Sequence, residues 1–281
     1  LSGQTGGTWP LRLVTGGVPL HAMLGLGGWL SLTAVGVSYR LLAMFLLAPE
    51  VERRTSRAVW WVGSLAIGLV AGCIPLVLFT LPGAQALVAV AMALMLVAAL
   101  LYGGDVVNIY RARKRKQAEL NIRASFAAFV ALALSVLFFN VPGLRAGEGT
   151  AALVYLFVFG WLSGLGLAQL YKIIAFLTWL EACGPVLGRV PVPRVQDLVD
   201  ERQARLWFWL YYGSVTAAGL ALFAEAGLIF RACVFLQLVA TLGVMREFVR
   251  ARRLSSVPAA LRVPPGVIRP NLFLPMFAPR R

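Results

Sequence analysis

The sequence predicts an all-α fold, a polytopic bundle of about seven membrane-spanning helices. Of its 281 residues, 60% are hydrophobic and only 13% are charged. The mean hydropathy of +0.81 is far from that of a soluble domain. The apolar residues form segments of about 20 residues or more, each long enough to cross a hydrocarbon core of ~30 Å as a helix. The period-2 alternation typical of lipid-facing barrel strands is absent from the sequence.

The expected helices follow one another with short links between them. Within them, small residues that let helix backbones approach each other predict close packing. Pro75 removes a backbone donor and should bend the second helix. The segments are residues 17–47, 58–80, 84–110, 122–140, 150–175, 205–225 and 227–249, and the small-residue pairs are Gly68 and Gly72, Gly160 and Gly164, and Gly213 and Ala217.

Positive charge alternates between successive links. The links at 49–57, 111–123 and 183–205 and the tail after Val249 are rich in arginine and lysine, whereas the other links hold one positive residue, Arg145. This positive-inside pattern predicts an N-terminus outside and a cytoplasmic C-terminus. It also explains the net charge of +15, because basic loops orient the protein in the membrane and attract anionic lipid headgroups. The expected partner is therefore the lipid bilayer and not nucleic acid. We expect an integral protein of a bacterial cytoplasmic (inner) membrane.

The ends of the chain suggest three regions. Residues 1–16 form a short outer lead, residues 17–249 a seven-helix transmembrane domain, and residues 250–281 a Pro- and Arg-rich cytoplasmic tail. Six prolines in that tail exclude a regular helix. The lead does not resemble a signal peptide. An N-terminus on the outer side of the membrane is difficult to explain without such a signal. We therefore expect the start to be truncated, with further spans upstream.

Catalytic side chains are scarce. The sequence has one histidine and lacks a Walker loop, a GxGxxG turn and a CxxC pair. A multi-histidine metal cage cannot be built from this chain alone, and a hydrolase, kinase or zinc enzyme is disfavoured. No catalytic residue is assigned, and whether the protein is an enzyme stays open.

The exception is His21, near the outer end of the first helix. A neutral imidazole at membrane depth can ligate heme iron or a copper ion. The glycines that follow, Gly25, Gly27 and Gly28, would let a flat macrocycle or a neighbouring helix approach the backbone. The alternative is a histidine that forms ordinary hydrogen bonds at the membrane interface.

The pattern around this histidine resembles a helix of the heme-copper oxidase subunit I superfamily, which includes NnrS-type heme proteins. The matching residues are His21, Leu24, Gly28, Trp29, Gly36 and Tyr39. Members typically have twelve spans, and the last seven would run from outside to inside, as expected here. The resemblance implies that His21 is a metal ligand, that heme is the first candidate cofactor and copper the second, and that the protein serves respiratory or nitric-oxide chemistry. Partners would be other respiratory membrane subunits or a cytochrome c.

The sequence also departs from this superfamily. The further histidines of its catalytic centre, two of them adjacent in the next helix, are missing, so this segment lacks a complete catalytic centre. A second axial ligand would come from upstream, from Met23 or from Met44. The alternative function is a non-catalytic membrane subunit or assembly factor without a cofactor.

Three ionisable residues lie toward the cytoplasmic ends of predicted helices: Arg40, Asp105 and Lys172. Arg40 and Lys172 could extend to the headgroups. Alternatively, Asp105 pairs with one of them in a structural polar cluster. Under pairing, a double alanine variant of Asp105 and its partner should cost less than the two single changes summed, whereas additive effects would argue against it.

Overall fold

The computed structural model describes residues 13–49, 54–79, 81–115, 117–145, 148–258 and 261. Among these residues there is no strand, and seven helices are long and apolar enough to cross a membrane. This confirms the predicted all-α fold with seven candidate spans. The spans are Val14–Leu46, Arg54–Leu78, Ala84–Arg111, Leu120–Phe139, Gly149–Val186, Glu201–Phe223 and Gly227–Arg252.

The chain forms two compact units, a division absent from the single domain expected over 17–249. Unit 1 contains residues 1–118 and 129–158, and unit 2 contains residues 119–128 and 159–281. One of the three boundaries lies just before α6 (Leu120–Phe139), the second inside α6 and the third inside η4 (Leu156–Ser163).

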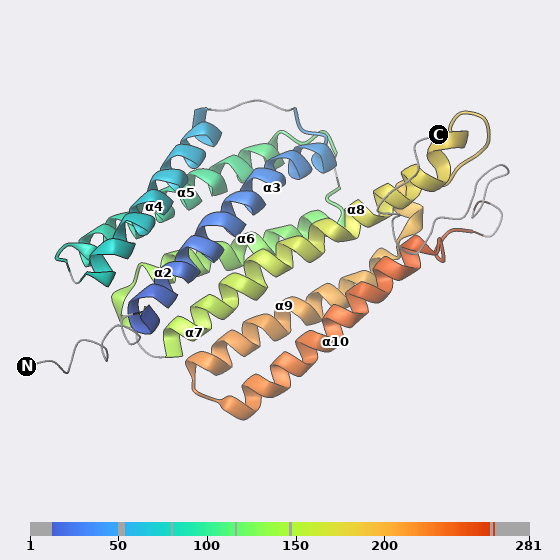
Figure 1. The fold of residues 1–281 in the computed structure, drawn as a ribbon. Helices are drawn as coiled ribbons and strands as arrows, with labels where there is room; N and C mark the ends of the chain where they lie inside the picture. The colour runs from blue at the N-terminus through green and yellow to red at the C-terminus, as the bar shows by residue number, and fades with distance from the viewer. Residues whose placement is uncertain are drawn as a thin grey trace, which may run out of the picture. The chain divides into compact units, whose positions relative to one another are not determined.

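Unit 1 begins with one long helix (Figure 1). The winding of this helix changes along its length. Its consecutive parts are η1 (Leu13–Gly17), α2 (Val18–Ala22), η2 (Met23–Leu30) and α3 (Ser31–Leu46). The parts η1 and η2 are π-helical, a wider winding that often marks functional positions. The helix starts four residues before the predicted boundary, inside the expected outer lead. Residues 1–12 of that lead lie outside the described residues.

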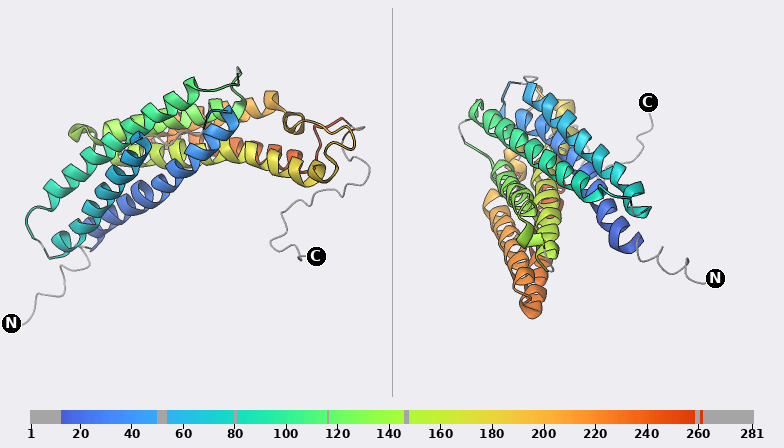
Figure 2. Two further views of the ribbon diagram at one scale, coloured as in Figure 1. Left: turned by 90° about the horizontal axis from the view of Figure 1, so that it is seen from above. Right: turned by 90° about the vertical axis from the view of Figure 1, so that its left-hand side faces the viewer.

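The next two helices of unit 1, α4 (Arg54–Leu78) and α5 (Ala84–Arg111), lie side by side (Figures 1 and 2). Their connection contains Gly83 with φ +97°, a backbone conformation that glycine adopts without strain. Unit 1 also contains the end of α6, the turn η3 (Pro142–Arg145) and α7 (Glu148–Tyr155). One buried hydrophobic cluster of the N-terminal helix, α4 and α5 consists of Leu20, Val70, Cys73 and Ala91.

Glycines bring the N-terminal helix close to α4, but not the pair singled out from the sequence. A Cβ added at Gly28 would lie 3.2 Å from Ile67, and one at Gly63 would lie 3.0 Å from Leu32. Gly68 and Gly72 are exposed, and an added Cβ at either would meet nothing within 4 Å among the described residues. The expected close contact through this pair is therefore not found there, because the pair faces away from the unit's core.

Unit 2 contains the start of α6, the end of η4, α8 (Gly164–Cys183), α9 (Glu201–Phe223) and α10 (Gly227–Arg252). The last two form an antiparallel hairpin (Figure 2). An added Cβ at Gly164 would lie 2.8 Å from the Tyr212 hydroxyl, so close packing at Gly164 is as expected. In contrast, Gly213 meets nothing within 4 Å among the described residues.

The fifth segment is longer than predicted. Its helix continues to Cys183 and not to residue 175, because no helix breaker occurs before Gly184 and Pro185. Two short 3-10 turns follow, η5 (Gly184–Val186) and η6 (Val195–Leu198). The predicted tail also starts as helix, since α10 ends at Arg252. The later residues Leu254 and Val257 pack with Cys183 and Leu198, whereas residues 262–281 lie outside the described residues.

Candidate functional site

His21 belongs to α2 and is exposed. Its neighbours along the same face of the helix, at spacings of three or four residues, are also largely open. Such spacing places residues above one another on one side of a helix. The face therefore forms a continuous accessible stripe, which we call the His21 stripe; its members are Val14, Val18, His21, Gly25, Trp29, Thr33, Val37, Arg40 and Met44.

The surface after His21 is open at Gly25 and aromatic one turn further, at Trp29. A Cβ added at Gly25, one turn away, would meet nothing within 4 Å among the described residues. Trp29, one turn further, is 76% exposed. A planar apolar group could therefore approach the backbone at Gly25 while the imidazole acts as a ligand. The part of the chain that the structure describes contains no group of three or more His, Cys, Asp or Glu suited to a metal ion.

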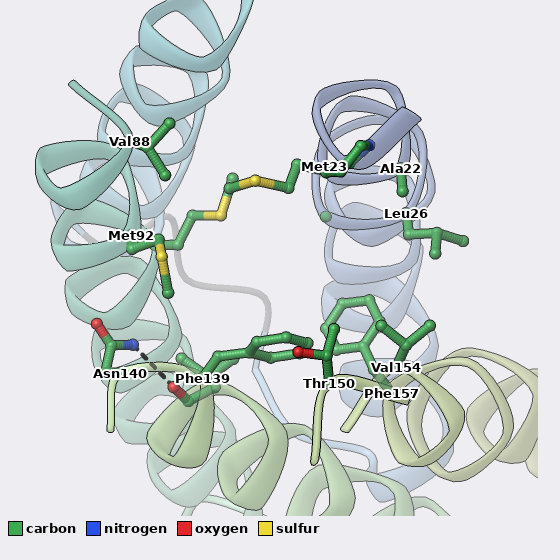
Figure 3. Close-up of a pocket in the computed structure, with 14 residues that line it drawn as sticks. Ala22, Met23, Leu26, Val88, Met92, Phe139, Asn140, Thr150, Val154 and Phe157 are labelled. Atoms are coloured by element: carbon green, nitrogen blue, oxygen red, sulfur yellow. Dashed lines mark hydrogen bonds between the residues drawn. The ribbon is translucent and has the colours of Figure 1, made fainter. Parts of the chain in front are cut away.

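Met23 lies on a different side of the same helix. It lines an apolar pocket of about 390 Å³ in unit 1, together with residues of α5, α6 and α7 (Figure 3). His21 does not line this pocket. Residues that are two positions apart in a helix project about 200° apart around its axis. The side chains of His21 and Met23 therefore project from nearly opposite faces. The structure thus separates these two predicted cofactor ligands, and each stays a prediction on its own.

Met44 is too far along the helix to join His21. The 23 positions between them correspond to roughly 35 Å of helix. Met44 is 45% exposed near the other end of the His21 stripe. It cannot be the second ligand of an ion bound to His21 within one chain.

Asp105 is buried in α5 and accepts hydrogen bonds from α3 and α4. The Tyr39 hydroxyl donates to Oδ2 at 2.8 Å, and the Thr55 hydroxyl donates to Oδ1 at 2.6 Å. These bonds join α3, α4 and α5 around one carboxylate that is 1% exposed. Pairing of Asp105 with Arg40 stays a prediction. The sequence did not identify Thr55, because a lone threonine at a helix start carries no signal of so distant a partner.

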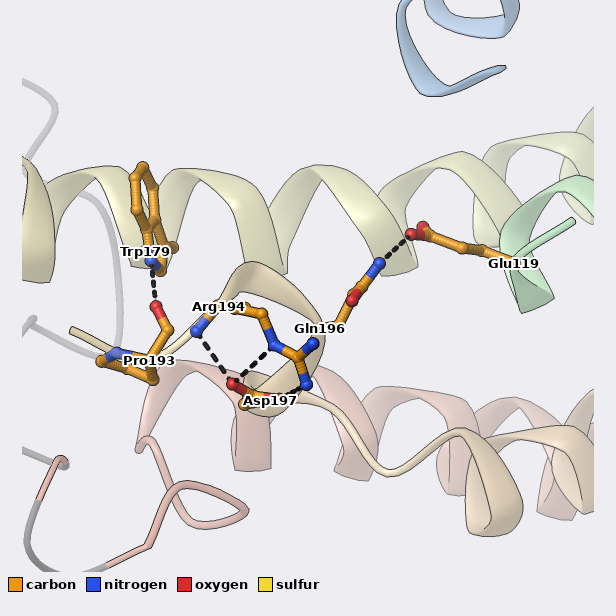
Figure 4. Close-up of polar contacts among 6 residues, drawn as sticks. All are labelled: Glu119, Trp179, Pro193, Arg194, Gln196 and Asp197. Atoms are coloured by element: carbon orange, nitrogen blue, oxygen red, sulfur yellow. Dashed lines mark hydrogen bonds and ion pairs between the residues drawn. The ribbon is translucent and has the colours of Figure 1, made fainter. Parts of the chain in front are cut away.

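Lys172, the third member of the predicted polar cluster, forms a salt bridge with Glu119 in unit 2. Their Nζ and Oε2 atoms are 2.5 Å apart, and the side chains are only 10% and 11% exposed. Glu119 also accepts a hydrogen bond from Gln196 at 2.8 Å (Figure 4). The sequence did not identify Glu119 as a partner because it lies in the link interpreted as a basic loop.

The connection between α8 and α9 has its own polar contacts (Figure 4). The Trp179 indole donates to the Pro193 carbonyl at 2.6 Å, which holds the loop against α8. The Arg194 guanidinium donates to the Asp197 carboxylate, which lowers the pKa of that carboxyl below its usual value. Because the Arg194 side chain is 78% exposed, this ion pair contributes little to stability.

Comparisons with protein-family models, with curated proteins and with solved structures give no match to this chain. The expected relation to the heme-copper oxidase superfamily therefore rests on the residues of the first helix.

Replacing Tyr39 by phenylalanine should lower the free energy of unfolding by about 1.5–3 kcal/mol, because the buried Asp105 carboxylate loses a hydrogen-bond donor. The measurement is thermal unfolding of the purified protein in detergent. Unfolding is detected by the labelling of its buried cysteines as they become accessible. Thr216→Val is the control: it removes an exposed hydroxyl bonded only to its own helix and should change stability by less than about 0.5 kcal/mol. Equal stability of Tyr39→Phe and wild type would show that the Tyr39 bond contributes nothing.

Proposed function

We propose that this protein is an integral membrane heme protein of the heme-copper-oxidase type, linked to respiratory or nitric-oxide chemistry, with His21 as one axial ligand. The observation that carries this proposal is the exposed imidazole of His21 beside the open backbone at Gly25. These are the two features a heme needs from a helix: a neutral nitrogen donor and room for the macrocycle.

The donor set of this face fits one side of a heme. His21 would bind and orient the group, and Trp29 would form an apolar wall that excludes water. Neither Met23 nor Met44 shares this position on the stripe, so the second wall and any second ligand must come from another part of the protein or from a partner. Heme, when bound, supplies one-electron redox chemistry. The role we assign to the chain is binding or support of electron transfer, without a complete catalytic centre.

The apolar surface of the protein indicates a membrane environment. Exposed Leu, Val and Phe side chains cover the candidate spans, and these faces contact the lipid bilayer. We place the protein in a bacterial cytoplasmic membrane, with other respiratory membrane subunits or a cytochrome c as partners.

A second candidate function is a cofactor-free membrane subunit or assembly factor. It is favoured by the length of the His21 stripe, which runs from Val14 to Met44 along the whole first helix. A face of that length could accommodate a helix of a partner protein instead of a heme.

The test is an absorption spectrum of the purified protein, oxidised and reduced, beside two variants. We expect a Soret band in wild type that His21→Ala shifts or removes. Gly25→Leu should also reduce heme content, because the new side chain fills the open space next to His21. Gly68→Leu is the matched control, since this glycine is equally open but lies on α4.

Two results would contradict the heme proposal. One is a wild-type protein that contains no heme. The other is a Soret band that is unchanged in both His21→Ala and Gly25→Leu. In either case the cofactor-free subunit would become the leading function, to be pursued by crosslinking along the His21 stripe.

A further inference from the structure

The pocket of unit 1 collects methionines. The sequence has six methionines, and three of them line this one pocket: Met23, Met92 and Met95. Its other lining residues are almost all aliphatic or aromatic, and no carboxylate, imidazole or ammonium group is among them. The pocket therefore offers thioether sulfur as its main donor atom.

The three methionines reach the pocket from two elements. Met92 and Met95 are three positions apart in α5 and so share one face of that helix. Met23 comes from η2, and Figure 3 shows Met23 and Met92 extending into the pocket from opposite sides. The Met95 sulfur lies 3.8 Å from the position of a Cβ added at Gly27, one turn after Met23. The Met95 thioether therefore lies against the N-terminal helix at Gly27.

Thioether sulfur is a soft, neutral ligand, and soft ligands select Cu(I) over harder ions. We propose that Met23, Met92 and Met95 bind a Cu(I) ion in this pocket. Apolar walls suit a monovalent ion better than a divalent one, because the cost of burying charge rises steeply with the charge. The rings of Phe139 and Phe157, which also line the pocket, add cation–π attraction for a cation without a counter-ion.

Free space distinguishes this pocket from a methionine-filled core. Methionine is a common gap filler in apolar interiors because its side chain adapts to irregular space. Here about 390 Å³ remains open between the methionines and the opposite wall. An ion bound by the three thioethers would occupy this open space.

The copper site is independent of the proposed heme. His21 does not line the pocket and leaves the helix on nearly the opposite face to Met23. Failure of one proposal thus leaves the other standing. His21→Ala should leave Cu(I) affinity unchanged, and Met92→Leu and Met95→Leu should leave any Soret band unchanged.

The experiment is a competition titration of the purified protein in detergent with Cu(I) against a chromogenic Cu(I) chelator, without oxygen. Wild type should bind one equivalent, with sulfur neighbours in the copper X-ray absorption spectrum. Each of Met23→Leu, Met92→Leu and Met95→Leu should weaken binding roughly tenfold or more, and the triple variant should abolish it. Leucine nearly conserves the volume of methionine, so folding should be retained. Met44→Leu and Met245→Leu, at exposed methionines away from the pocket, are the controls.

Three outcomes would overturn the proposal: no Cu(I) binding by wild type, the same affinity in the triple variant, or the same loss in the control variants. Mass spectrometry of the purified protein identifies the competing occupant. If an apolar molecule is retained equally by wild type and the triple variant, and neither binds Cu(I), the pocket holds that apolar ligand and no metal.

Discussion

Replacing Lys172 by alanine is expected to destabilise the protein strongly. The variant leaves the Glu119 carboxylate without its ammonium partner at a position where its side chain is only 11% exposed. Removal of one partner of a buried ion pair typically costs 3–5 kcal/mol, because the remaining charge is desolvated and uncompensated. We expect a loss of about 3 kcal/mol here, since Gln196 still donates a hydrogen bond to Glu119.

A double-mutant cycle separates the ion pair from general packing. Lys172→Ala and Glu119→Ala should each destabilise strongly, and the double variant should cost clearly less than their sum. Thermal unfolding in detergent gives the values, with Arg194→Ala as the control in an exposed ion pair, where the expected effect is below about 1 kcal/mol. Additive losses in the cycle would show that Lys172 and Glu119 do not interact energetically.

Gly243→Ala is expected to disrupt the α9–α10 hairpin. A Cβ at this position would lie 2.2, 2.4 and 2.6 Å from three atoms of the Trp207 indole ring. A rigid ring cannot yield as the end of a flexible side chain can, so the two helices must separate or the indole must change rotamer. Overpacking of this kind costs about 1–3 kcal/mol, and the expected loss lies at the upper end of that range.

The matched control is Gly213→Ala, which also adds one methyl group to a glycine within this hairpin but meets nothing within 4 Å among the described residues. It should be neutral or slightly stabilising, because alanine favours helix more than glycine does. Trp207→Leu in the Gly243→Ala background should recover part of the loss. If Gly243→Ala and Gly213→Ala had equal stability, the close approach of α10 to Trp207 would be disproved.

The helices could be predicted from the sequence because the signal for a span is local. About 20 consecutive apolar residues determine that a segment forms a helix in a membrane, whatever surrounds it. The boundaries were less accurate where the signal was weak. The helix ending at Cys183 continues beyond the apolar part of its segment, and only Gly184 and Pro185 stop it.

Helix contacts were harder to predict, because the sequence does not show whether a glycine pair faces another helix of the protein or its surface. Gly164 contacts Tyr212 as expected, whereas Gly68 and Gly72 are open. The closest approach, at Gly243, belongs to none of the motifs. A close contact needs a large neighbour at the right height on another helix, and that neighbour can be anywhere in the sequence.

For the candidate site, the sequence by itself identified His21 as the one imidazole and placed Asp105 and Lys172 in apolar segments, where charge demands a partner. Residue type and hydropathy suffice for such inferences. The groups that each of these side chains faces depend on the tertiary structure. It joined Asp105 to Tyr39 and Thr55, 66 and 50 positions away, and Lys172 to Glu119. It also brought Met23, Met92 and Met95 to one pocket on the side of the helix away from His21. Those pairings depend on how helices rotate and pack, and that depends on the fit of whole surfaces and not on any one segment.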